Sequence, residues 1–231
     1  MGYPKDAFRM GCLAPLYMEN AMENYIEAKE IFDKIQKGDE EWPQYTEENL
    51  TKKVSIVVVF CAMAIESFLN DYAAAALNDN NYYKCYDSLS IASKFQLIVQ
   101  FILRKEFDKG KEPYGLLSKL TTSRNELVHN KSFDYSDILE NPNSIDEKDK
   151  IEYIDILKED LKSATDAVRA VVKLVNYFET NDMGTSACER MFASFTLCYF
   201  ENEEESLALK ELLKLGLNVE RQKPLKYCTK K

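Results

Sequence analysis

Apolar residues recur along most of this chain at the three- and four-residue spacing that places them on one face of a helix. This spacing predicts five long helices followed by two shorter ones. The long helices are expected over about 15–35, 47–77, 88–102, 114–130 and 145–178, and the short ones over about 188–200 and 206–215. Only seven glycines and six prolines interrupt the chain, fewer than the turns of an all-β fold usually need. The pattern therefore predicts an all-α fold.

The predicted helices divide into two parts along the chain. The long helices predict a helical bundle over residues 1–180, and the shorter ones a C-terminal helical extension over residues 181–231. From Arg221 onward the sequence has five basic residues and no acidic one, so the extension is expected to end in a basic tail.

The second predicted helix is the most apolar one. Residues 54–65 are apolar on nearly all sides, which is typical of a helix at the centre of a bundle. The β-branched start of this stretch would also suit a buried strand. Residues 62–76 continue the pattern, are rich in alanine and contain no turn signal, so the length of the segment favours a helix.

The composition indicates a reducing, cytoplasmic location. No apolar signal segment is visible in residues 1–12, and the longest uninterrupted apolar run, residues 56–65, is half of the roughly 20 residues that cross a membrane. We therefore expect no membrane association. The cysteines form no Cys-x-x-Cys pair, so we expect them to be reduced and mostly buried, Cys61 most clearly. The six cysteines are at positions 12, 61, 85, 188, 198 and 228.

The net charge of −9 argues against a protein that coats nucleic acid in bulk. Its distribution is uneven, because residues 84–131 contain nine basic and five acidic residues, whereas the segments before and after are both acidic. This positive segment contains the chain's only histidine, His129. A difference of a few charges along a sequence also arises by chance.

The most distinctive chemistry lies near the end of the helix predicted over 114–130. Helical spacing places Leu117, Leu120, Leu127 and Val128 on one inward stripe, with Arg124 on the same stripe. A guanidinium stays charged, so we expect Arg124 to face either a buried acid or an interface with another chain. Asn125 and His129 are four residues apart and are therefore expected to lie on one face of the helix.

The Arg124-Asn125-x-x-x-His129 motif resembles the signature of the HEPN family (higher eukaryotes and prokaryotes nucleotide-binding). Residues 64–70, Ala-Ile-Glu-Ser-Phe-Leu-Asn on the long second helix, and Lys94 among apolar residues on the third helix are similar to many members. The resemblance covers about residues 50–131. It implies a HEPN-like bundle that cleaves RNA without a metal ion or other cofactor, at a cleft between two copies of the chain.

On the pattern of the family, the resemblance gives each motif residue a role. His129 would move a proton at the ribose 2′-hydroxyl, Arg124 would stabilise charge on the phosphate, and Asn125 would orient the phosphate or the histidine. The products would be a 2′,3′-cyclic phosphate and a 5′-hydroxyl. Many such proteins are toxins or phage-defence effectors with a neutralising partner such as an antitoxin. The alternative is a non-catalytic dimeric helical module that binds a partner protein or a nucleotide.

Glu66 lies inside the most apolar predicted helix. A buried carboxylate normally pairs with a cation, and Arg124 and Lys94 are the two candidates. Glu66 is then either a residue that positions Arg124 for catalysis or a member of a core ion pair without a chemical role. On either interpretation, we expect Glu66→Gln to lower activity or stability more than a change at an exposed acid such as Glu40.

Glu126 and His129 also have the Glu-x-x-His spacing of carboxylate-bridged di-iron bundles. Such sites need two of these elements and two further glutamates. Because the chain has one histidine, a single copy cannot supply them, and we expect no metal site. The sequence also contains no glycine-rich phosphate loop and no readable nucleophile–histidine arrangement.

Overall fold

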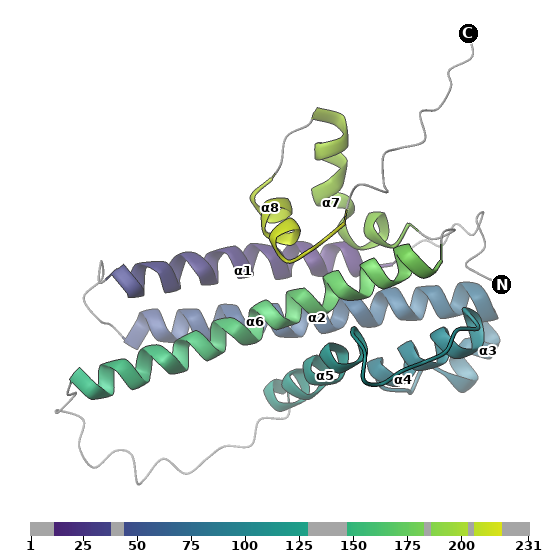
Figure 1. Ribbon diagram of the computed structural model, residues 1–231, viewed down its shortest axis with the longest axis horizontal. Coiled ribbons are helices and arrows are strands. Elements are labelled where there is room, and N and C mark those ends of the chain that lie inside the picture. The colour runs from purple at the N-terminus through teal and green to yellow at the C-terminus, as the bar shows by residue number, and fades with distance from the viewer. Residues whose placement is uncertain (1–11, 38–43, 129–146, 183–185, 203–205, 219–231) are drawn as a thin grey trace.

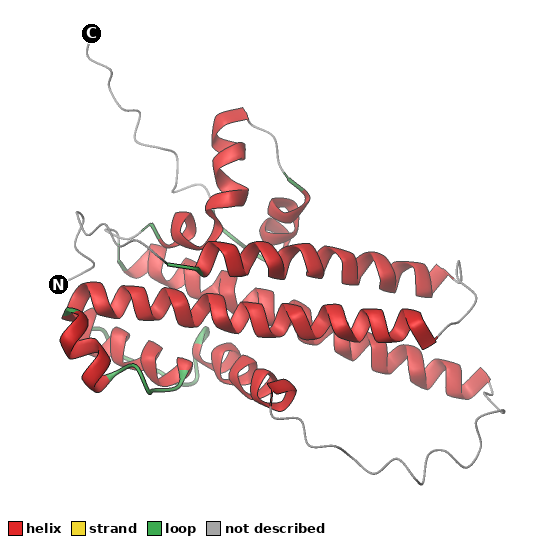
Figure 2. Ribbon diagram, turned by 180° about the vertical axis from the view of Figure 1, so that it is seen from behind, coloured by secondary structure: helices red, strands yellow, loops and turns green. Residues whose placement is uncertain are grey.

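The computed structural model describes residues 12–37, 44–128, 147–182, 186–202 and 206–218, and every regular element in these ranges is helical (Figures 1 and 2). The predicted all-α fold class is therefore confirmed. The elements in chain order are α1 (Ala14–Lys37), α2 (Gln44–Leu77), α3 (Asp79–Cys85), α4 (Ile91–Leu97), the π-helical turn η1 (Ile98–Ile102), α5 (Tyr114–Val128), α6 (Glu147–Asn181), α7 (Ala187–Asn202) and α8 (Leu207–Lys214).

Three long helices, α1, α2 and α6, lie side by side and form the body of the molecule (Figure 1). Hydrogen bonds from Thr51 and, further along α2, from Tyr72 reach Asp160 in the first half of α6 and Asp182 just after its end, so α2 and α6 run in the same direction. The α1 helix runs the opposite way, since Lys53 of α2 pairs with Glu27 and Ser67 of α2 accepts a hydrogen bond from the backbone of Leu13. The α4 and α5 helices pack on the opposite side from α7 and α8 (Figure 2).

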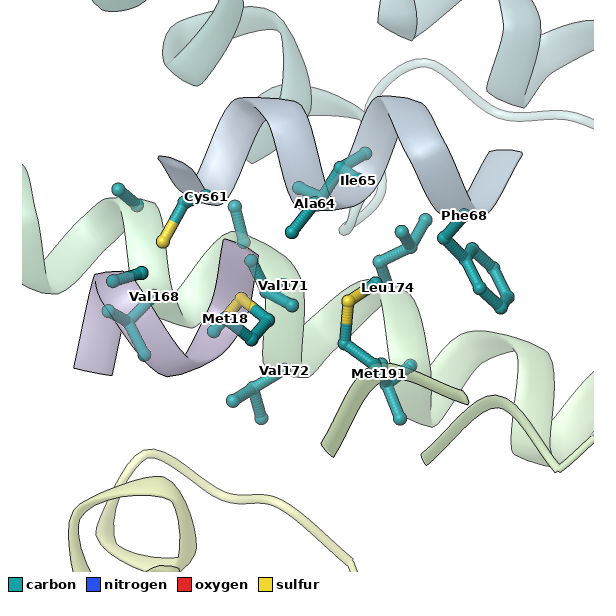
Figure 3. Packing of buried hydrophobic residues seen from close by; sticks show 14 of the residues in the cluster. Met18, Cys61, Ala64, Ile65, Phe68, Val168, Val171, Val172, Leu174 and Met191 are labelled. Carbon is teal, nitrogen blue, oxygen red and sulfur yellow. The ribbon is translucent and has the colours of Figure 1, made fainter. Parts of the chain in front are cut away.

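The core lies where α2 faces α6 and α1. Cys61 and Ile65 of α2 lie near Val171 of α6, with Met18 of α1 and Met191 of α7 in the same cluster (Figure 3), and the ring of Phe68 is 5.1 Å from that of Phe178 of α6. Cys61 is fully buried, as predicted, and burial raises the pKa of its thiol. Cys188 is also buried, but Cys85 is exposed, so burial holds for only some of the described cysteines.

The α2 helix is apolar on most sides because α1, α5 and α6 surround it. By length and composition alone, Glu48–Leu77 is apolar enough to cross a membrane, and within the described ranges it is the one helix that is. A core helix in a bundle has the same composition, and half of the most apolar window of this helix is buried inside the molecule.

The segment between α2 and α5 differs from the prediction in two respects. The short helix α3 was not predicted, and α4 begins after Ser90 rather than at about Ser88. The Ser90 hydroxyl accepts a hydrogen bond from the backbone of Ser93 at 3.3 Å, which satisfies one of the free N–H groups of the first turn. Three residues after α4 begins, Lys94 is buried among apolar side chains.

The C-terminal helices α7 and α8 share the core of the long helices. Cys188 and Met191 of α7 and Leu209 and Leu212 of α8 are fully buried. The α8 helix is tied to α1 by an ion pair between Glu211 and Lys29 at 2.5 Å, and Lys214 pairs with the same carboxylate at 2.8 Å. The packing of α8 therefore combines apolar burial with one charged cluster.

The Glu211 cluster makes a pH-dependent contribution to stability. Burial of the Glu211 carboxyl acts to raise its pKa, but hydrogen bonds and charges from Lys214 and Lys29 outweigh burial and leave the pKa below the usual 4.5. A carboxylate with a lowered pKa stabilises the fold above pH 4.5, and this contribution is lost as the pH falls through the lower pKa. We expect Glu211→Gln to lower the free energy of unfolding by about 1–2 kcal/mol at neutral pH.

Thermal or urea unfolding at neutral pH and at pH about 3 measures this contribution. The difference between wild type and Glu211→Gln should shrink at the lower pH, because the wild-type carboxyl takes up a proton as the pH falls through its lowered pKa. Glu30→Gln, an isosteric change at an exposed acid of α1, is the matched control and should be neutral at both values. An equal difference at both pH values would contradict the charge-based account.

Candidate functional site

The candidate motif lies on the second half of α5. The first half of this helix packs against α2, α4 and α6, and its buried residues are Leu117 and Leu120. Lys119 donates to Asp166 of α6 at 2.6 Å, which fixes α5 along the side of that helix. The packing therefore anchors the beginning of α5, while the last two turns of this helix lie at the surface.

The predicted inward stripe does not continue to the end of α5. Leu127 is 41% exposed and Val128 is 51% exposed, so the prediction that they are buried with Leu117 and Leu120 is wrong. Helical spacing identifies residues that share a face, but it does not say how far a neighbouring helix covers that face. The result is two apolar side chains on the surface beside Arg124 and Asn125.

Arg124 is half-buried, and its Nη1 donates a hydrogen bond to Oδ1 of Asn125 at 3.0 Å. No carboxylate among the residues that the structure describes lies within ion-pair distance of this guanidinium. Asn125 and Glu126 are exposed. The structure thus presents a positive group that is oriented by an amide and not neutralised by a described acid, while His129 lies outside the described residues.

Glu66 pairs with Lys94, not with Arg124. The Nζ of Lys94 donates to Oε1 of Glu66 at 2.8 Å across α4 and α2. The lysine is the more buried partner, with a side chain that is 2% exposed, whereas the glutamate side chain is 38% exposed. The expectation of a buried carboxylate is therefore wrong. The buried charged group is the Lys94 ammonium of α4, and the Glu66 carboxylate that pairs with it is partly exposed to solvent.

The predicted site residues thus form two pairs in the structure. Arg124 and Asn125 are joined on α5, and Glu66 and Lys94 are joined between α2 and α4. No hydrogen bond or ion pair connects one pair to the other within the described part of the chain. Glu66 and Lys94 therefore have the contacts of a core ion pair, which is one of the two interpretations that the sequence left open.

Sequence reasoning did not predict a pocket of about 410 Å³ at the opposite end of α5. Its lining comes from α4, from the loop before α5, from the first residue of α5 and from α6. In the sequence, only the aromatic residues Phe107, Tyr114 and Tyr177 point to this pocket. Their positions along the chain do not show that their side chains lie together. Burial raises the pKa of the Tyr177 hydroxyl, so this side chain is neutral at physiological pH.

Among the described residues, no group of three or more His, Cys, Asp or Glu side chains is placed to hold a metal ion. Comparisons of the chain with protein-family models, with curated proteins and with solved structures found no match.

Proposed function

We propose that this chain is a HEPN-type endoribonuclease that cleaves RNA without a metal ion and acts as a homodimer. The observation that supports the proposal most directly is the Arg124–Asn125 pair on the exposed half of α5, because its guanidinium is held by an amide and has no described carboxylate partner. A guanidinium of this kind is suited to bind a phosphate through two parallel hydrogen bonds.

The proposed reaction is an attack of the ribose 2′-oxygen on the neighbouring phosphorus. His129 takes the proton of the 2′-hydroxyl, which suits an imidazole with a pKa near 6.5. The 2′-oxygen–phosphorus bond forms, the bond from phosphorus to the 5′-oxygen breaks, and that oxygen takes a proton from the imidazolium of His129 or from water. Arg124 stabilises the charge that grows on the phosphate oxygens, and Asn125 orients the guanidinium. The products are a 2′,3′-cyclic phosphate and a 5′-hydroxyl.

The exposed apolar residues Leu127 and Val128 support the dimer. They lie one turn from Arg124, so a second copy that covers them also comes close to the guanidinium. The two motif residues are five positions apart, which is about 140° around a straight helix, and two copies related by a two-fold axis bring the arginine of one toward the histidine of the other.

The proposed biological setting is cytoplasmic, with RNA as substrate. A HEPN ribonuclease that acts on cellular RNA is toxic to its own cell, so the proposal includes a neutralising partner such as an antitoxin, or a trigger in phage defence. The acidic chain, with a net charge of −9, fits contact with selected RNA sites better than bulk RNA binding.

We expect RNA cleavage by the purified dimer to be unchanged by excess EDTA. The motif supplies a general base and a fixed cation, so the reaction as proposed has no step for a divalent ion. The assay is cleavage of a labelled RNA with and without the chelator, followed by identification of the ends. Loss of cleavage on chelation that magnesium or manganese restores would contradict the mechanism. A stable dimer that cleaves no RNA would favour the non-catalytic module.

A further inference from the structure

The pocket at the beginning of α5 combines aromatic rings with charged side chains. The rings of Phe107 and Tyr114 are 5.3 Å apart at 85°, and those of Phe95 and Tyr177 are 5.2 Å apart at 77°. Phe107 also contacts Phe95 at 5.9 Å, so all four rings form one connected cluster. These rings, with the loop residues around them, line a volume of about 410 Å³, which is large enough for a small organic molecule.

The perpendicular rings favour a compact ligand over a flat one. A planar ring system that stacks on Tyr114 meets Phe107 at a right angle, whereas a roughly spherical group can touch both rings at once. The face of an aromatic ring carries negative potential and attracts cations. The Nζ of Lys109 already lies over the Tyr114 ring, 5.9 Å from its centroid, so a positive group can reach this ring in the folded protein.

The charges around the pocket leave one carboxylate available to a cation. Three carboxylates line it, against two lysines. Asp108 is paired with Lys111, and Glu112 is paired at 3.1 Å with Lys173 of α6. Glu106 is exposed and has no ion-pair partner among the described residues. The remaining unpaired groups are therefore the Glu106 carboxylate and the Lys109 ammonium, which is placed over an aromatic ring as a ligand cation would be.

We propose that this pocket binds an organic ammonium ion, with its positive group against Phe107 and Tyr114 and near the Glu106 carboxylate. Lys109 then competes for the same ring. The proposal is independent of ribonuclease activity, because the pocket is lined by none of the motif residues. Two sources share this chemistry: small molecules with a quaternary ammonium group, and polyamines.

Isothermal titration of the full-length protein with choline and with spermidine, at low salt and without RNA, tests the proposal. We expect one of the two to bind with a dissociation constant in the millimolar range or tighter, and the tighter one identifies the source. Glu106→Gln should weaken that binding about threefold or more, and Tyr114→Leu about fivefold or more. Lys109→Gln should strengthen it, because it removes both the competing ammonium and a repulsive charge.

Glu30→Gln, the exposed isosteric change on α1, is the matched control for Glu106→Gln and should leave binding unchanged. Circular dichroism verifies that Tyr114→Leu is folded, and Glu106→Gln gives a test that does not depend on an aromatic residue of the core. Adenosine monophosphate serves as the anionic comparison. Three results would each overturn the proposal. The first is that neither cation binds, and the second is that a cation binds but all three variants leave its affinity unchanged. The third is that the nucleotide binds more tightly than either cation and that Lys109→Gln weakens the binding of the nucleotide.

Discussion

Arg124→Ala is expected to lower the rate of RNA cleavage by a factor on the order of 10³, because in the proposed mechanism this guanidinium stabilises the charge on the phosphate. Arg124→Lys should recover little of this loss, since an ammonium cannot make the two parallel hydrogen bonds of a guanidinium. The measurement is the single-turnover rate on a labelled RNA. Arg169→Ala, at an arginine of α6 that is paired with Asp166, is the matched control and should keep near wild-type activity. Equal rates for both variants would remove Arg124 from the mechanism.

Mixing two inactive variants tests whether the site is shared between chains. Arg124→Ala and His129→Ala should each be inactive alone. After subunit exchange, each mixed dimer contains one intact arginine–histidine pair, so an equal mixture should recover about a quarter of wild-type activity. Native mass spectrometry verifies that mixed dimers form. No recovery in their presence would contradict a site that needs one arginine and one histidine from different chains.

Glu66→Gln is expected to lower the free energy of unfolding by about 2 kcal/mol, because it leaves the buried Lys94 ammonium without its carboxylate. The value is below that of a fully buried pair, since the Glu66 side chain is 38% exposed and water can partly solvate the lysine's end. Urea unfolding measures the loss. Glu40 lies outside the described residues, so Glu30→Gln serves as the comparison at an exposed acid and should change stability by less than about 0.5 kcal/mol.

A second variant separates the ion pair from other effects of the glutamate. Glu66→Gln combined with Lys94→Met removes both charges and fills the space with an apolar chain of similar length, so it should be more stable than Glu66→Gln alone. If the double variant is no more stable than the single one, the ion pair is not the source of the loss. The rate of RNA cleavage per folded molecule then distinguishes a structural role of Glu66 from a catalytic one. If Glu66 is only part of a core ion pair, this rate should be the same in Glu66→Gln as in the wild type.

The long helices could be predicted because their burial follows the helical period. In α6, Leu157, Val168, Val175 and Phe178 recur at helical spacing and are all buried, whereas Ile154 and Leu161 are partly exposed. The short helix α3 was missed because seven residues are too few to establish a period, and it starts after Asn78, a residue with a positive φ of 65°. Local capping therefore decided the structure of this segment.

The candidate site was predictable only in part. The sequence identified Arg124 and Asn125 as neighbours on a helix, and it placed Lys94 and Glu66 among apolar residues. It did not determine that Lys94, rather than Arg124, is the partner of Glu66, because that choice depends on how α4 and α5 are placed beside α2. The exposure of Leu127 and Val128 depends on the same placement. The HEPN relationship stays a prediction.

The parallel pairing of α2 with α6 has a consequence for synthesis of the chain. The most apolar helix is complete by Leu77, but α6, which covers one of its sides, ends at Asn181. At roughly 5–20 residues per second, the ribosome needs about 5–20 seconds to add these roughly 100 residues. During that interval α1 is already made and α4 and α5 follow, but the side of α2 that packs against α6 has no partner, so the nascent chain exposes apolar surface. We therefore expect yield in cells to depend on a chaperone that binds chains as they emerge.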